Sequence, residues 1–227
     1  INAVYEMLNN PVNNFTIGIV DDVTNLSLEP IAINTKKCNE WLFYGYGSDG
    51  MVSASKSIIK LIGDNTDKYV QGYFQYDSKK SGGVTCSHLR FSEDKIRSSY
   101  YVEKPSLVVI TKDSYLEEYD LLSDINEGAT VIINSTHNEE EINRMINYNL
   151  KKVLLKNKAK VYLINAFELA NQVGLRGKIS TIMETLIFKL GKIIDFDFAV
   201  NVGKADLVTV AHQDDVYNYD YSNTIVN

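Results

Sequence analysis

Cysteine, proline and histidine are scarce in this chain of 227 residues, which contains two, three and three of them. The two thiols, Cys38 and Cys86, are too few for a four-thiolate zinc site or an iron–sulfur cluster bound by this chain alone. No spacing links the three histidines as metal ligands, and no nucleophile–base pair is recognisable. We therefore expect no metal site, no catalytic residue and two reduced thiols, which are typical of a cytoplasmic protein.

An excess of basic residues and a long apolar run are also lacking. Lys and Arg number 23 against 29 Asp and Glu, so the net charge of −6 provides no general field for nucleic acid. No apolar run reaches the length of a membrane span, and no secretory signal is visible. These absences predict a soluble protein that binds neither nucleic acid nor membrane. Because the chain begins at Ile1, we expect it to be a piece of something larger.

Short apolar runs alternate with helical patterns from Cys38 onward. The expected strands are 15–20, 42–45, 69–76, 107–111, 130–134 and 160–165, and the expected helices are 52–62, 115–124, 139–155, 166–173 and 179–194. Such alternation favours an α/β fold, a three-layer Rossmann-like domain with a mostly parallel, doubly wound sheet. The expected organisation is an entry segment at 1–37 with a linker over 25–37, the α/β domain at 38–194, and a divergent C-terminal extension at 195–227.

A glycine-rich turn separates the first strand of this domain from its first helix. It contains Gly47, Ser48, Asp49 and Gly50, and its spacing satisfies G-x-G-x-x-G. A strand, glycine turn and helix in this order aim backbone N–H groups and the positive end of the helix dipole at an anion. The alternative is a tight turn that only packs helix on strand.

A second candidate loop, with two lysines, follows the next expected strand. Lys79, Lys80, Ser81 and Gly82 provide ammonium groups, a hydroxyl and a backbone amide that suit a phosphate. A solvated basic turn is the alternative, and Lys56 in the first helix either joins the same anion site or is exposed. Both loops, and also the segment 134–136, follow strand ends, where open α/β sheets bind ligands.

Four further residues have roles suggested by their local pattern. His88 and Arg90 share one face of a short strand and either clamp a phosphate or carboxylate or belong to an edge-strand surface. Ser114 begins an S-x-x-E capping-box pattern. Asn138 precedes three glutamates, which the helix dipole favours in a first turn.

Several of these segments together resemble one enzyme family. Residues 45–52 (GYGSDGMV), 76–85 (YDSKKSGGVT), 87–91 (SHLRF) and 96–98 (IRS), with 15–24 (FTIGIVDDVT) upstream, are similar to pyruvate:ferredoxin (flavodoxin) oxidoreductases. The likeness is to the internal domain equivalent to the gamma subunit of 2-oxoacid:ferredoxin oxidoreductases. It covers about residues 15–190 and is most specific in the 76–85 string.

The resemblance implies a role in pyruvate metabolism. The family decarboxylates pyruvate on thiamine diphosphate with Mg, passes electrons through 4Fe–4S clusters to ferredoxin or flavodoxin, and transfers the acetyl group to coenzyme A as acetyl-CoA. The clusters and thiamine diphosphate would then belong to other domains or subunits of a homodimeric enzyme. This domain would bind coenzyme A, through the following residues: Gly47, Ser48, Asp49, Gly50, Lys56, Lys79, Lys80, Ser81 and Gly82.

Two other functions remain open from the sequence. A freestanding NAD(P)-binding dehydrogenase would use the glycine turn, with Asp77 as the acid that binds ribose. Asp77 lies 27 residues past Gly50, whereas about 20 is the usual interval. A non-catalytic assembly module derived from the same domain is the second alternative.

Overall fold

The structure is a computed structural model that describes residues 16–20, 28–32, 38–77, 83–122, 124–172, 174–175, 178–202 and 217–219. The chain divides into two compact units, residues 1–37 and 38–227. The first unit contains an antiparallel pair of strands, β1 (Thr16–Val20) and β2 (Leu28–Ala32). The expectation of a linker over 25–37 is therefore wrong at β2. Pro30 is tolerated there because each strand of a two-stranded ribbon has an edge that needs no N–H donor.

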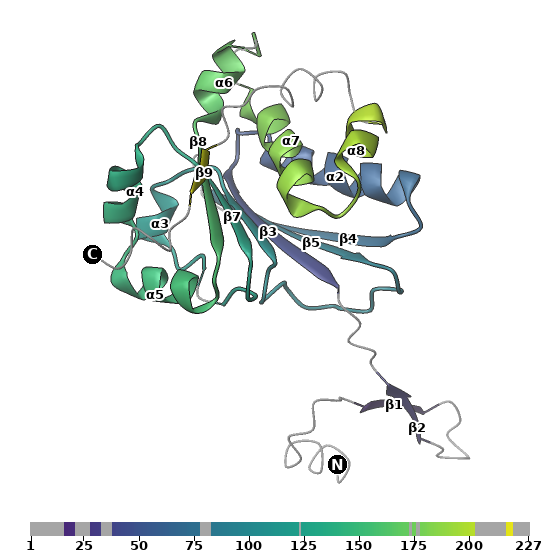
Figure 1. Cartoon of the computed structure of the whole chain (residues 1–227). Helices are drawn as coiled ribbons and strands as arrows, with labels where there is room; N and C mark the ends of the chain where they lie inside the picture. The colour runs from purple at the N-terminus through teal and green to yellow at the C-terminus, as the bar shows by residue number, and fades with distance from the viewer. Residues whose placement is uncertain are drawn as a thin grey trace. The chain divides into compact units, whose positions relative to one another are not determined.

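The second unit is built on a mixed seven-stranded sheet with the order β4-β5-β3-β6-β7-β8-β9 (Figure 1). Its strands are β3 (Asn39–Tyr46), β4 (Tyr69–Tyr76), β5 (Val84–Ser92), β6 (Leu107–Ile110), β7 (Thr130–Asn134), β8 (Lys160–Ile164) and β9 (Tyr217–Tyr219). Strands β3, β6, β7 and β8 are parallel, β5 is antiparallel to both β3 and β4, and β9 is antiparallel to β8. The prediction of a mostly parallel sheet is confirmed.

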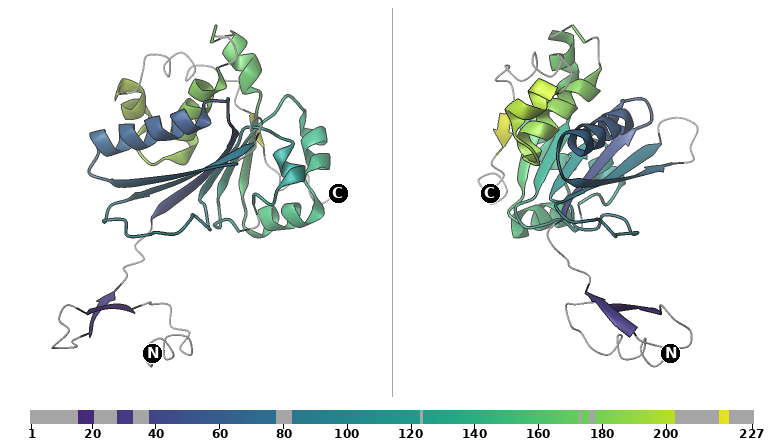
Figure 2. Two further views of the ribbon diagram at one scale, coloured as in Figure 1. Left: turned by 180° about the vertical axis from the view of Figure 1, so that it is seen from behind. Right: turned by 90° about the vertical axis from the view of Figure 1, so that its right-hand side faces the viewer.

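Helices cover both faces of this sheet, which gives the three layers expected from the sequence (Figures 1 and 2). They are α2 (Met51–Asn65), α3 (Tyr115–Glu118), α4 (Glu139–Met145), α5 (Tyr148–Lys156), α6 (Ala166–Gln172), α7 (Ile179–Gly191) and α8 (Phe196–Val202). Apolar residues of α2, α6, α7 and α8 pack with Trp41, Phe43 and Val109 on one face. Those of α3, α4 and α5 pack with Val108 and Ile133 on the other. The alternating side chains of continuous apolar strands thus supply two cores.

Helix ends account for most differences between the expected and observed helices. Asn138 forms the full capping box that starts α4, with its side chain accepting from Glu141 N and the Glu141 carboxylate accepting from Asn138 N. The expected helix 139–155 is instead two helices, because Asn147 is extended and its side chain caps α5 at Leu150 N. Ser114 makes no side-chain cap, so that expectation is wrong, and α3 ends after one turn at Glu118.

The C-terminal segment contributes to the domain beyond the expected helix 179–194. The helix α8 follows α7 and buries Ala199 in the first core, and β9 pairs with β8. None of the described helices is both long and apolar enough to cross a membrane.

Candidate functional site at the carboxyl edge of the sheet

The order of the strands places a topological switch point between β3 and β6. From β3 the chain continues through α2 towards β4 on one side of the sheet, whereas from β6 it continues through α3 towards β7 on the other. The two strands are parallel neighbours, so their carboxyl ends lie side by side. In open α/β sheets the connections diverge at such a point and leave a crevice that binds ligands.

The glycine turn at the end of β3 is organised around the buried carboxylate of Asp49. Its Oδ2 accepts from Tyr46 N at 2.9 Å and from Thr111 Oγ1 at 2.6 Å, and its Oδ1 accepts from Met51 N at 2.9 Å. One side chain therefore ties together the end of β3, the end of β6 and the first residue of α2. Gly45 is required beneath it, because a Cβ there would lie 2.6 Å from Asp49 Oδ2.

This arrangement changes the interpretation of the turn. The amides on either side of the predicted residues 47–50, those of Tyr46 and Met51, donate to Asp49 and do not face an external anion. The turn itself therefore accounts for the buried charge of the Asp49 carboxylate, because the hydrogen bonds from the turn compensate the cost of burying that charge. Gly47 and Ser48 are exposed, and a Cβ at Gly47 would meet nothing within 4 Å. Within the described residues nothing therefore requires glycine at position 47.

The strand ends that flank the second candidate loop, those of β4 and β5, lie at the same edge of the sheet as the end of β3. Tyr76 at the end of β4 pairs with Thr85 of β5, and Tyr46 at the end of β3 pairs with Val84. The amide of Asp77 donates to the carbonyl of Val84 at 3.1 Å. The ends of β3 and β4 are therefore separated by β5 alone, which is about 10 Å at two strand spacings.

Four of the sequence-predicted residues of that loop, Lys79, Lys80, Ser81 and Gly82, lie outside the described residues. Lys56 is exposed on α2, with its Nζ 5.3 Å from the centre of the Phe74 ring.

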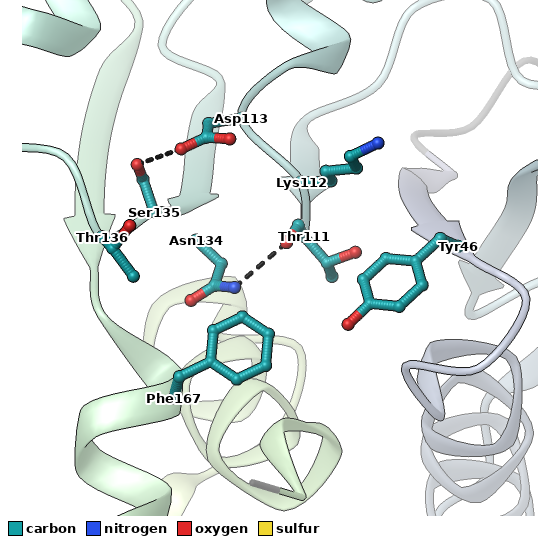
Figure 3. Close-up of a pocket in the computed structure, with 8 residues that line it drawn as sticks. All are labelled: Tyr46, Thr111, Lys112, Asp113, Asn134, Ser135, Thr136 and Phe167. Carbon is teal, nitrogen blue, oxygen red and sulfur yellow. Dashed lines mark hydrogen bonds between the residues drawn. The ribbon is translucent and has the colours of Figure 1, made fainter. Parts of the chain in front are cut away.

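A cavity of about 360 Å³ opens beside the glycine turn at the switch point (Figure 3). Its lining comes from the ends of three neighbouring strands, β3, β6 and β7, and from the first turn of α6: Tyr46, Thr111, Lys112, Asp113, Asn134, Ser135, Thr136 and Phe167. Among the residues that line this cavity, the sequence indicated only the segment 134–136 as part of a ligand-binding edge. The remaining lining residues follow parallel strands, and that position is the signal by which they could have been found.

The amide side chain of Asn134 fixes the floor of the cavity. Its Nδ2 donates to Thr111 O at 3.0 Å, and its Oδ1 accepts from Ala166 N at 2.9 Å. Asn134 is buried and connects the ends of β6 and β7 with the start of α6. The cavity is thus held by hydrogen bonds that the chain makes with itself.

A second cavity, of about 480 Å³, is lined by His137 and also by Ser135 and Thr136, which line the first cavity as well. His137 Nδ1 lies 2.8 Å from Asp113 Oδ2, and Ser135 Oγ donates to the same oxygen. Hydrogen bonding to Asp113 and its charge raise the pKa of His137. Burial tends to raise the pKa of Asp113, but its hydrogen bonds to Ser135 and His137 outweigh that effect and lower it. Because Nδ1–H is directed at Asp113, this nitrogen cannot remove the Ser135 proton as a nucleophile's base would.

Arg90, which sequence patterning offered as a phosphate clamp, is part of the structure of the domain. It is 2% exposed in β5. Its Nε lies 2.5 Å from Glu40 Oε1, and its Nη1 donates to Gln71 Oε1 and Tyr100 O. The edge-strand alternative is also wrong, because β5 lies between β3 and β4.

His88 is buried on the same face of β5 as Arg90. Its Nδ1 accepts from Val102 N at 3.2 Å, its Nε2 lies 2.9 Å from Gln75 Oε1, and its ring stacks on Tyr101. The backbone donor at Nδ1 requires the neutral ring with the proton on Nε2. Burial and the nearby charge of Arg90 lower the pKa of His88 to about 4.

Comparison with known proteins gives the class first. The fold resembles that of the pyruvate oxidoreductase subunit PORC of Thermotoga maritima, with a TM-score of 0.59 and 20% identity over 82% of this chain and 100% of that one. A 2-oxoglutarate:ferredoxin oxidoreductase of Magnetococcus marinus, solved with 2-oxoglutarate, coenzyme A and succinyl-CoA bound, matches with a TM-score of 0.53 and 12% identity over 82% of this chain and 34% of that one. The chain is therefore a doubly wound α/β domain of the type found in 2-oxoacid oxidoreductases.

The sequence comparison then gives the family. Residues 40–215 match the model of the pyruvate ferredoxin/flavodoxin oxidoreductase family, and the chain belongs to that family. The pyruvate:ferredoxin oxidoreductase of Moorella thermoacetica is 42% identical over 213 residues, which are 92% of this chain and 18% of that protein. The chain thus spans less than a fifth of the length of this relative.

Proposed function

We propose that this chain is the coenzyme A-binding domain of a pyruvate:ferredoxin or pyruvate:flavodoxin oxidoreductase. The whole enzyme would oxidatively decarboxylate pyruvate to acetyl-CoA and CO₂. Its other domains or subunits would contain thiamine diphosphate, Mg and the 4Fe–4S clusters, would pass electrons to ferredoxin or flavodoxin, and would form a homodimer. This domain would bind coenzyme A and position its thiol, a contribution of proximity rather than of bond-making chemistry.

The observation that carries this proposal is the shared position of the two strand ends that precede the candidate loops. The register of β5 with its two neighbours brings the end of β3 and the end of β4 to one edge of the sheet. Exposed backbone at Gly47 and Ser48 would approach a phosphate closely, and the N-terminus of α2 adds a favourable dipole. The side chains and amides of 79–82 would complete the anion site, with Lys56 at its margin.

The order of the strands argues against the NAD(P)-dependent alternative. In a dinucleotide-binding fold the acid that binds ribose ends the strand next to the one that carries the glycine turn. Here Asp77 follows β4, and β5 separates that strand from β3. An assembly module with the same fold would differ from the proposed domain in one measurable property, because it would not bind coenzyme A.

Isothermal titration calorimetry of the intact oxidoreductase with coenzyme A and, separately, NADH tests the proposal. We expect saturable binding of coenzyme A and none of NADH. Absence of coenzyme A binding to the intact protein would refute the proposed function. NADH binding in its place would favour the dehydrogenase.

A further inference from the structure

The described helices cover only part of the sheet face that is turned away from α2 (Figure 2). On this face α3, α4 and α5 pack against β6, β7 and β8. Over β5 and β4 the face is covered instead by an irregular segment, residues 98–102, which we call the strap. The apolar cluster beneath the strap is small and consists of Leu42, Cys86 and Val102. This half of the face is held mainly by polar contacts.

Three polar side chains of β4 and β5 hold the backbone of the strap at every second residue. The hydrogen bonds run from Gln71 Nε2 to Ser98 O at 2.8 Å, from Arg90 Nη1 to Tyr100 O at 2.7 Å, and from Val102 N to His88 Nδ1 at 3.2 Å. His88 and Arg90 are buried, so water competes little for these bonds. The strap is therefore fixed within the domain itself, which lowers the entropy cost when its outer surface binds a partner.

Four tyrosine rings form the outer surface of this half of the face. Tyr69 and Tyr73 alternate with inward-facing residues of β4, and Tyr100 and Tyr101 belong to the strap. The ring centres of Tyr73 and Tyr101 are 5.1 Å apart. The four residues are 49%, 52%, 62% and 47% exposed, which leaves about 400 Å² of tyrosine surface if a whole side chain has about 200 Å². Exposed patches of this size often mark interaction sites.

Unused hydrogen-bond donors accompany the rings. Arg90 Nη2 is buried and has no hydrogen-bond partner among the described residues, although Glu40 and Gln71 bind the other nitrogens of its guanidinium group. The ring of Tyr100 lies 4.9 Å from the guanidinium carbon. An oxygen that displaces this exposed ring would satisfy Nη2, and an unpaired buried donor is costly.

The strand β4 adds an unpaired backbone edge to the same surface. It is the last strand on its side of the sheet, and its outer edge pairs with none of the described strands. Proteins generally cover such an edge, because its N–H and C=O groups otherwise pair with other chains. The rings, the free guanidinium nitrogen and the edge together suit a partner that presents apolar side chains and acceptor oxygens.

The size of the surface decides which partner is considered. Two separate copies in a stable dimer bury about 800 Å² each, about twice what the four tyrosines expose. Domains of one protein need less, because their linkage keeps them at a high effective concentration. The relative from Moorella thermoacetica has more than four-fifths of its length outside the region that this chain matches. Another domain of the same protein is therefore the partner that the area favours.

We propose that Tyr69, Tyr73, Tyr100 and Tyr101, with the edge of β4, form the surface on which this domain docks against another domain of the same oxidoreductase. The partner surface is apolar and carries oxygen acceptors. This inference rests on the part of the proposed function that makes the chain one domain of a larger enzyme, and not on coenzyme A binding. The docking surface lies on the flat face of the sheet, whereas the proposed coenzyme A site lies at its carboxyl edge.

Hydroxyl-radical labelling of the intact oxidoreductase, read by mass spectrometry, tests whether the surface is covered. The oxidation rate of each tyrosine is divided by its rate in the enzyme unfolded in urea. We expect about tenfold protection of the four tyrosines, as in the buried centre of an interface. Tyr148, which is 77% exposed on α5, is the control and should be oxidised at close to its unfolded rate. Protection of only about twofold, which the exposure of the four residues in this chain predicts, would overturn the proposal.

Photocrosslinking identifies what covers the surface. The photoreactive amino acid p-benzoylphenylalanine replaces Tyr73 in the intact oxidoreductase, and the same replacement at Tyr148 is the control. We expect crosslinks from position 73 to a segment of the enzyme outside the region equivalent to this chain. Crosslinks to the equivalent domain of a second copy would overturn the proposal in favour of a dimer contact.

Coenzyme A is titrated into the same wild-type sample, so that the two proposals can fail separately. Protected tyrosines without coenzyme A binding would leave the docking surface standing and refute the proposed function. Coenzyme A binding with only twofold protection would refute the docking surface and leave the proposed function standing.

Discussion

Replacement of Asp49 by Asn tests whether this carboxylate organises the glycine turn. The carboxylate accepts three hydrogen bonds, from Tyr46 N, Met51 N and Thr111 Oγ1. Hydrogen bonds to charged groups contribute about 1.5–3 kcal/mol each. An Asn side chain keeps one acceptor oxygen and turns an NH₂ group towards a buried N–H donor. We therefore expect Asp49→Asn to lower the free energy of unfolding of the chain by about 2–3 kcal/mol.

The assay is urea denaturation of the 227-residue chain, followed by far-ultraviolet circular dichroism at 25 °C. Ser48→Ala is the control, because Ser48 is the exposed neighbour of Asp49 and should change stability by less than about 0.5 kcal/mol. A cycle with Thr111→Val isolates the bond across to β6, with an expected coupling of about 1 kcal/mol. If Asp49→Asn is as stable as Ser48→Ala, the carboxylate does not organise the turn, and a role for it towards a ligand would have to be reconsidered.

Three further outcomes follow from the same structure. Gly45→Ala should destabilise the chain by about 1–3 kcal/mol in urea denaturation, because its Cβ would contact Asp49 at 2.6 Å. Gly47→Ala should leave stability unchanged and weaken coenzyme A binding. Equal effects of the two substitutions on stability would contradict this prediction. The double variant Lys79→Ala with Lys80→Ala should bind coenzyme A about 10–100-fold more weakly in calorimetry of the intact protein, and unchanged affinity and turnover would favour the assembly module. The pKa of His88, about 4 in the folded chain and about 6.5 in the unfolded chain, means that unfolding takes up a proton between these values. The free energy of unfolding should then fall by about 2 kcal/mol as the pH drops from 6.5 to 4, and His88→Gln, measured by urea denaturation across this range, should lack that component.

The regular elements with a clear apolar period could be predicted from the sequence. The strands at 69–76 and 130–134 have the expected ends, because aromatic and β-branched residues favour strands and turn residues bound both runs. The helix 139–155 could not be predicted as two helices, since Asn147 has the pattern of an ordinary helix-surface residue although its side chain caps α5, next to the buried Ile146. Local patterning is weakest where tertiary packing decides the end of an element.

The candidate site was predictable only in part, for a related reason. The ends of the two strands that precede the loops could be placed at one edge, because the carboxyl ends of parallel strands meet there. The position of β5 between β3 and β4 depends on pairing between residues far apart in the chain. The sequence of an individual strand does not indicate which strands it pairs with. Phe167 was missed because an aromatic residue in the first turn of a helix has the pattern of a core residue. The role of Asp49 within the turn was missed because its partner Thr111 is 62 positions away.

A structure of the intact oxidoreductase in complex with coenzyme A tests the central claim most directly. We expect the phosphates of coenzyme A at the carboxyl ends of β3 and β4, beside Gly47 and the loop at 79–82. Coenzyme A bound entirely on another domain, with the crevice between β3 and β6 filled by protein side chains, would contradict the account.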